Sequence, residues 1–131
     1  MLRLDTNVLV RYLVWDDEAQ FEKARKLIKR EVAAGRRVFV SQLVLLETEW
    51  VLRSRYSLPK NLIIAAISGL LDATDVRFED ESAVEEALFI WKDTTADFAD
   101  CLIGTQNRRL GCRATASFDL RASKLPGFIA V

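Results

Sequence analysis

The chain of 131 residues contains no histidine. This absence excludes Ser-His-Asp and Cys-His catalysis, histidine general bases and every metal site with a histidine ligand. Enzymatic chemistry must then use carboxylates, lysines, hydroxyl groups or a metal ion held by oxygen atoms. Because oxygen ligands suit Mg²⁺ or Mn²⁺ better than Zn²⁺, any metal site should be of the magnesium or manganese type.

Cysteine and proline (two residues each) and glycine (five) are scarce, and the net charge is zero. Cys101 and Cys112 lack the spacing of metal ligands, so we expect reduced thiols in a cytoplasmic protein. No apolar run approaches the ~20 residues that span a bilayer, and Asp5 interrupts any signal peptide. The zero charge gives no overall support for nucleic-acid binding. These features predict a single globular domain over residues 1–131, without membrane contact.

The spacing of apolar residues predicts strands that alternate with helices. Strands are expected at 2–5, 37–41, 75–80, 112–117 and, at the edge of the sheet, 127–131. Helices are expected at 7–14, 43–55 and 94–111, and in the amphipathic stretches that carry Ala24, Ile63 and Ala87. This alternation indicates an α/β fold in which helices cover both faces of a parallel sheet.

Acidic residues directly follow two of the predicted strands. Asp5 and Asp119 lie just beyond carboxyl ends of strands, where open α/β folds place their ligands. A structural role is the alternative for each: Thr6 or Asn7 can cap the helix after Asp5, and Ser117 or Asp119 can form a turn or an N-cap. The shared position of the acids, more than any single residue, indicates a site.

Glu47 and Glu49 lie on different faces of the helix predicted at 43–55. Every helical neighbour of Glu47 is apolar, so we expect this acid on the buried stripe. A buried acid needs a partner, which is either a distant arginine or the chemistry of a cleft or metal site. Arg53 stands four residues after Glu49, so these two are expected to form an ion pair at the surface or the rim.

Three aspartates follow one another at 93, 97 and 100. They share one helical face if the helix reaches back to Asp93, and like charges at this spacing repel. Asp97 has the alternative role of capping the helix, whereas Asp100 has no cation within a turn. Gly104, one turn later, permits the close approach of another backbone or a substrate.

Four segments together resemble the VapC-type PIN-domain ribonucleases, the toxins of bacterial toxin–antitoxin pairs: LDTNVLVRYL at 4–13, VSQLVLLETEWVLRSRY at 40–56, ADFADCLIG at 96–104 and SFD at 117–119. The segments keep the order of the family's motifs, and Ser117 departs from the family's more frequent threonine. The resemblance implies a PIN-like three-layer α/β/α sandwich with a central parallel sheet of four to five strands. It places the family's acids at Asp5, Glu47, Asp100 and Asp119, with Asp97 as a frequent accessory acid.

The resemblance also implies an activity, the hydrolysis of RNA phosphodiester bonds with Mg²⁺ or Mn²⁺, leaving a 5′-phosphate. Asp5 and Asp100 are assigned as direct metal ligands, while Glu47 and Asp119 act through water or orient the nucleophile. Supporting contacts are assigned to Thr6, Asn7 and Ser117. The implied partners are the RNA substrate, a second copy of the chain and a cognate VapB-type antitoxin. Candidate RNA contacts are Arg11, Arg53, Arg55, Arg108, Arg109 and Arg121.

Two other functions stay open on the sequence. A Mg²⁺-dependent phosphohydrolase or phosphoacceptor domain also carries acids at strand ends, but it usually needs a second acid beside Asp5, where Thr6 and Asn7 stand. The other is a catalytically inactive PIN-like module that binds RNA or a protein. The presence of all four family acids argues against this second alternative.

Overall fold

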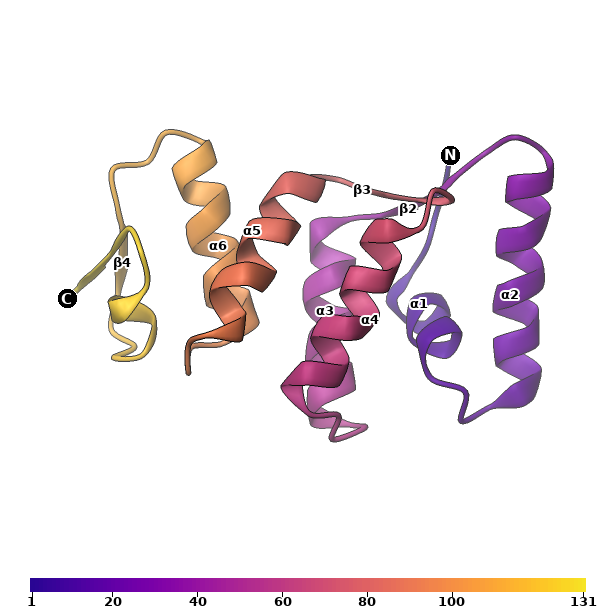
Figure 1. Ribbon diagram of the computed structural model, residues 1–131, viewed down its shortest axis with the longest axis horizontal. Coiled ribbons are helices and arrows are strands. Elements are labelled where there is room, and N and C mark those ends of the chain that lie inside the picture. Colours follow the sequence, from indigo (N-terminus) through magenta and orange to yellow (C-terminus); the bar gives the residue numbers. More distant parts are fainter. The chain divides into compact units, whose positions relative to one another are not determined.

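The structure is a computed structural model that describes all 131 residues, Met1–Val131. The chain divides into two compact units: unit 1 is Met1–Glu79 and unit 2 is Asp80–Val131. Figure 1 labels helices α1 to α6 and strands β2, β3 and β4 along the chain. None of the helices combines the length and the apolar character that a membrane span requires.

Unit 1 is built on a parallel sheet of three short strands in the order β1-β2-β3. The strands are β1 (Leu2–Arg3), β2 (Val38–Val40) and β3 (Val76–Phe78). Val38 and Val40 of the central strand are completely buried, as expected for β-branched residues in a parallel sheet. Because all three strands run in the same direction, their carboxyl ends share one edge, and Asp5 and Ser41 follow β1 and β2 there.

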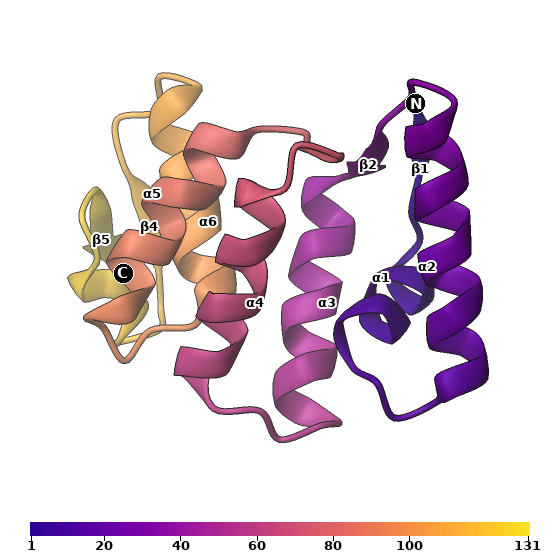
Figure 2. The same ribbon diagram turned by 45° about the vertical axis from the view of Figure 1, so that its right-hand side comes forward.

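Four helices complete unit 1: α1 (Thr6–Leu13), α2 (Glu18–Ala33), α3 (Gln42–Ser54) and α4 (Lys60–Asp72). The first three begin at side-chain caps from Asp5, Asp17 and Ser41, whose oxygen atoms accept backbone N–H groups of the first turn. Figure 2 shows α3 and α4 side by side, and α1 packs against both α2 and α3. The short strands and capped helices thus place the start of α1 at the carboxyl edge of the sheet.

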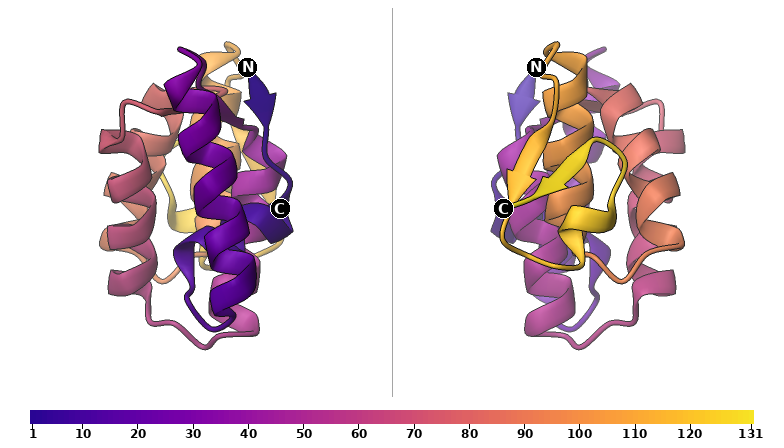
Figure 3. Two further views of the ribbon diagram at one scale, coloured as in Figure 1. Left: turned by 90° about the vertical axis from the view of Figure 1, so that its right-hand side faces the viewer. Right: turned by 90° about the vertical axis from the view of Figure 1, so that its left-hand side faces the viewer.

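Unit 2 contains α5 (Glu81–Lys92), α6 (Phe98–Arg109), β4 (Thr115–Ser117), the 3₁₀ turn η1 (Ala122–Lys124) and β5 (Phe128–Ala130). Helices α5 and α6 pack on each other through the rings of Trp91 and Phe98, whose centroids are 5.2 Å apart. Strands β4 and β5 are parallel and lie side by side in the right-hand view of Figure 3. The turn η1 connects them and contacts both strands.

Gly104 lies in α6 at the point where the ring of Phe128 from β5 rests against the helix. A Cβ atom at Gly104 would overlap with this ring. The close approach that the sequence predicted at Gly104 therefore exists, but the neighbour is an aromatic side chain of the same unit. The neighbour is thus neither another backbone nor a substrate, the two possibilities that the sequence suggests.

The expected α/β class with parallel strands is confirmed, and the five strands form a sheet of three and a pair. The helix expected at 94–111 begins later, at Phe98, because the chain turns at Ala96, whose N–H donates to Thr94 Oγ1. Asp93 is instead the C-cap of α5. The predicted helical face shared by Asp93, Asp97 and Asp100 is therefore not formed.

Candidate functional site

Asp5 is the N-cap of α1, at the carboxyl edge of the three-stranded sheet. The alternative in which Thr6 or Asn7 caps this helix is not found, because the N-cap is Asp5 itself: its backbone is extended and its Oδ1 accepts the N–H of Thr6 at 2.8 Å. Thr6 is buried beneath this turn, whereas Asp5 and Asn7 are exposed. Asp5 forms no ion pair within unit 1, so its second carboxylate oxygen is free for a ligand.

The burial of Glu47 and Glu49 is the reverse of what the sequence predicted. Glu47 is exposed, while Glu49 is only 2% exposed. The expected ion pair of Glu49 with Arg53 is formed, with Oε2 and Nε 2.9 Å apart. Glu49 is therefore a structural acid of the unit 1 interior, and Glu47 is the acid of α3 that a ligand can reach.

The burial of Glu47 and Glu49 was predicted wrongly because apolar residues are distributed all around α3. The buried positions of the helix are Gln42, Leu45, Thr48, Glu49 and Leu52. Apolar residues also occupy the opposite face, where Leu43 is 79% and Trp50 is 50% exposed. A helix that is apolar on all sides has no single stripe, so the pattern could not decide which glutamate points inward.

In unit 2, the predicted acids Asp97 and Asp119 both lie within electrostatic reach of a third, Asp100. Asp97 is the N-cap of α6, but its side chain makes no capping hydrogen bond. Asp100 follows in the first turn and is half-buried. Partial burial raises the pKa of the Asp100 carboxyl, and the negative charges of Asp119 and Asp97 raise it further. No ion pair within unit 2 compensates these charges.

Asp119 is held in place by the loop after β4. Its Oδ1 accepts the backbone N–H groups of Arg121 at 2.8 Å and Ala122 at 2.9 Å, which starts η1. Ser117, the last residue of β4, accepts the N–H of Asp119 at 3.0 Å through its Oγ. The turn role expected for Ser117 and Asp119 is thus confirmed, and it fixes the carboxylate of Asp119 relative to its own backbone.

The donor set suits a divalent cation. The five predicted acids are oxygen donors without ion pairs inside their own units, and the repulsion that acts on Asp100 is the kind that a bound cation relieves. Neither unit by itself gathers three acids closely enough to enclose a metal ion.

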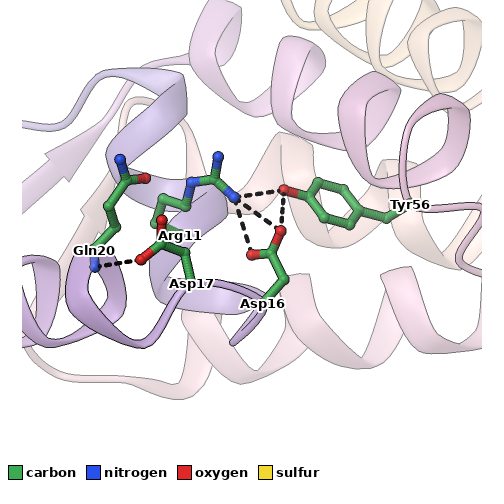
Figure 4. A network of polar contacts seen from close by, with 5 residues as sticks. All are labelled: Arg11, Asp16, Asp17, Gln20 and Tyr56. Atoms are coloured by element: carbon green, nitrogen blue, oxygen red, sulfur yellow. Dashed lines mark hydrogen bonds and ion pairs between the residues drawn. The ribbon is translucent and has the colours of Figure 1, made fainter.

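One polar network of unit 1 was not predicted from the sequence (Figure 4). Arg11 of α1 donates through Nη1 to both oxygens of Asp16, at 3.0 and 2.9 Å, and to the hydroxyl of Tyr56 at 2.8 Å. The Tyr56 hydroxyl in turn donates to Asp16 Oδ2 at 3.0 Å. Partial desolvation opposes ionisation of Asp16, but the hydrogen bonds from Arg11 and Tyr56 keep its pKa below the ordinary value. Tyr56 is 45 residues from Arg11, so no local pattern indicated this contact.

Most of the candidate RNA-contacting arginines are engaged in ion pairs. Besides Arg11 and Arg53, Arg108 pairs with Glu86 and Arg109 with Asp80, at 3.0 and 2.9 Å. Arg108 also donates to the carbonyl oxygen of Pro126 at 2.6 Å. Arg53 thus pairs along α3, whereas Arg108 and Arg109 connect α6 with α5 and its N-cap.

Known proteins resemble this chain over most of its length. A family model described as "PIN domain" matches residues 3–127. The VapC ribonuclease of Aquifex aeolicus (strain VF5) is 26% identical over 125 residues, which cover 95% of this chain and 92% of the relative. A solved structure, the sarcin–ricin loop cleaving toxin VapC20 of Mycobacterium tuberculosis, is 21% identical in sequence and has a TM-score of 0.44. The match covers 92% of this chain and 89% of the VapC20 chain.

The family match confirms the resemblance that four sequence segments indicated, and with it the PIN-like α/β fold class. It extends from the end of β1 to the residue before β5, so it includes every predicted acid from Asp5 to Asp119. Because this match takes in nearly all of its residues, the chain belongs to the PIN-domain family.

Proposed function

We propose that this PIN domain is a metal-dependent endoribonuclease that hydrolyses RNA phosphodiester bonds as the toxin of a type II toxin–antitoxin pair. The observation that carries the proposal is the group of Asp97, Asp100 and Asp119, in which the charges of Asp97 and Asp119 both act on Asp100 and no ion pair of the unit compensates them. The similarity to a VapC ribonuclease supports the RNA substrate.

In this proposal Asp5 and Asp100 hold Mg²⁺ or Mn²⁺ directly. Their free carboxylate oxygens have the chemistry that such ions require. When bound, the ion lowers the pKa of a coordinated water and neutralises charge on the substrate phosphate. The two residues supply the negative charge and the orientation, which Asp5 gains from its capping hydrogen bond.

The remaining acids orient water and substrate. Asp119 has a fixed carboxylate because two backbone N–H groups and the loop from Ser117 hold it. Glu47 is exposed and unpaired in unit 1, so it is free to accept a proton or to bind a metal-coordinated water. Asn7 presents an exposed amide one residue after the buried Thr6 and supports the substrate.

The proposal is tested by incubating the protein with structured and unstructured RNAs, with Mg²⁺, Mn²⁺ or EDTA. We expect internal cleavage that EDTA abolishes and that Asp5→Asn reduces by at least about a hundredfold. Asp17→Asn is the matched control, because Asp17 is also a helix N-cap whose Oδ1 accepts a backbone N–H. Asparagine caps a helix as well as aspartate, so both variants should stay folded.

Cleavage that persists in EDTA or in Asp5→Asn would overturn the metal mechanism. RNA that is bound but never cut would favour the inactive PIN-like module instead. A homodimer, a VapB-type antitoxin and a cytoplasmic, single-domain protein are further parts of the proposal. Because a bound antitoxin would hide the activity, the protein is unfolded in denaturant, separated from any partner and refolded before the assay.

Glu47 and Glu49 provide a second prediction. We expect Glu47→Gln to lower cleavage by tenfold or more without changing the free energy of unfolding, because Glu47 is exposed. Glu49→Gln should keep the cleavage activity but lose about 1–2 kcal/mol of stability, since it removes the buried charge that pairs with Arg53. Urea unfolding and a cleavage assay on both variants check this. Loss of cleavage in Glu49→Gln together with full activity of Glu47→Gln would contradict the assignment of Glu47 to the site.

A further inference from the structure

A cavity between α1 and α2 opens next to the start of α1. Its volume is about 280 Å³, and it is lined by Asn7, Val8 and Arg11 from α1 and by Gln20, Lys23, Ala24 and Leu27 from α2. Asn7 is the second residue of α1 and stands two positions after Asp5, the N-cap of this helix. The cavity therefore begins beside a proposed metal ligand and extends along α1 within unit 1.

Unpartnered hydrogen-bond donors surround this cavity. The side-chain amides of Asn7 and Gln20 and the ammonium group of Lys23 have no partner in unit 1, and no acid lines the cavity. Gln20 uses only its backbone N–H, which donates to Asp17. Donors that point into one cavity without an acceptor are suited to an anionic ligand with several oxygen atoms.

Arg11 is held at the cavity in one orientation. Its Nη1 is occupied by Asp16 and Tyr56, while Figure 4 shows Nε and Nη2 pointing away from both. Asp16 pairs with Arg11 and the charge of Asp17 also acts on it, so Lys23 is the cation of the lining that no acid pairs with. A guanidinium that is fixed on one side can present its free N–H groups with little loss of conformational freedom on binding.

The remaining lining residues are apolar: Val8, Ala24 and Leu27. A ligand must therefore combine a negative charge with a flat or apolar part. A nucleotide has both, because its phosphate is anionic and every base has an apolar face. The apolar part also distinguishes this cavity from a site for a free inorganic anion.

We propose that the cavity binds the RNA strand next to the scissile bond, with a phosphate at Lys23 and Arg11 and a nucleoside against Val8 and Leu27. Arg11 lies six residues along α1 from Asp5, or about 9 Å at the rise of an α-helix. This distance corresponds to about two to three nucleotides of a stacked strand. The inference rests on the proposed ribonuclease function and adds to it the position of the flanking strand.

The test measures binding of a fluorescently labelled single-stranded RNA in EDTA, where no cleavage is expected, by anisotropy at several salt concentrations. We expect Lys23→Gln to weaken binding about tenfold and to reduce the slope of log Kd against log salt by about 0.7. Lys29→Gln, on the same helix but outside the cavity, removes the same charge and should change Kd less than about twofold. Tyr56→Phe, which removes one of the contacts that orient Arg11 without changing any charge, should give a smaller loss than Lys23→Gln.

A second measurement uses the unmodified protein and does not depend on the folding of any variant. Bound RNA should protect Lys23, but not Lys29, from amine-reactive labelling, as read by mass spectrometry of peptides. Equal labelling of both lysines with and without RNA would overturn the inference.

The outcomes separate this inference from the proposed function. If metal-dependent cleavage occurs and Lys23→Gln binds RNA as tightly as Lys29→Gln, the ribonuclease stands and the cavity assignment falls. If the protein neither binds nor cuts RNA, both fall. A labelled poly-glutamate peptide is tested in parallel: if Lys23→Gln weakens only peptide binding, the cavity belongs to an acidic protein partner and the assignment to RNA is wrong.

Discussion

Asp100→Asn should abolish the metal-dependent cleavage of RNA while making the metal-free protein more stable. The loss of cleavage is expected to reach about 10²–10³-fold, because the substitution removes a proposed direct ligand and the negative charge that attracts the cation. Asp93→Asn is the control for activity, since Asp93 lies in the same unit as the C-cap of α5 and takes no part in the acid cluster.

The gain in stability follows from the charges around Asp100. Its pKa is raised by partial burial and by the charges of Asp119 and Asp97, so the folded protein holds the ionised form less well than the unfolded chain does. The destabilisation is absent below the unfolded pKa, near the ordinary value of 3.8, and is fully present once the pH exceeds the raised folded pKa. We therefore expect Asp100→Asn to add a few tenths of a kcal/mol at neutral pH, as removal of a like-charge neighbour does.

Urea unfolding in EDTA between pH 4 and 8 measures this effect. The advantage of Asp100→Asn should shrink as the pH falls, because the wild-type carboxyl takes up a proton. Addition of Mg²⁺ or Mn²⁺ should reverse the order of stability, since ligand at about 100 times its Kd stabilises a folded protein by about 2.7 kcal/mol. A variant that is less stable than wild type in EDTA, or that still cuts RNA, would contradict the role of Asp100.

The second large effect is expected at Gly104, which faces the ring of Phe128. Gly104→Ala should destabilise the protein by about 1–2 kcal/mol, because the new methyl group overlaps with the ring and this cost exceeds the gain in helix propensity. Gly69→Ala is the matched control in α4: no atom lies within 4 Å of a Cβ at this position. It should stabilise the protein by up to about 1 kcal/mol.

Thermal and urea unfolding of both variants check the opposite signs. A double-mutant cycle with Phe128→Leu identifies the cause, since most of the cost of Gly104→Ala should vanish when the ring is removed. If Gly104→Ala is as stable as Gly69→Ala, or if its loss is the same in the presence of Phe128→Leu, the ring does not limit the space at this position.

Local sequence determined where the elements and the acids lie along the chain. Alternating apolar segments predicted parallel strands and helices, and the structure has them. The ion pair of Glu49 with Arg53 was also predictable, because residues four apart are neighbours on any helix. The four motif segments indicated the PIN-domain family, which the family match confirms. Each of these features depends on residues that are close in sequence.

Tertiary packing decided which acids are buried and which side chains surround them. Whether Glu47 or Glu49 is buried depends on which side of α3 meets its neighbours, and a helix with apolar residues on every side does not determine this. The contact of Gly104 with Phe128, the network of Arg11 with Tyr56 and the repulsion between Asp100 and Asp119 each join residues 19 or more positions apart. Such contacts form only after whole elements have packed, so the side chains that surround each acid could not be derived from the spacing of the sequence.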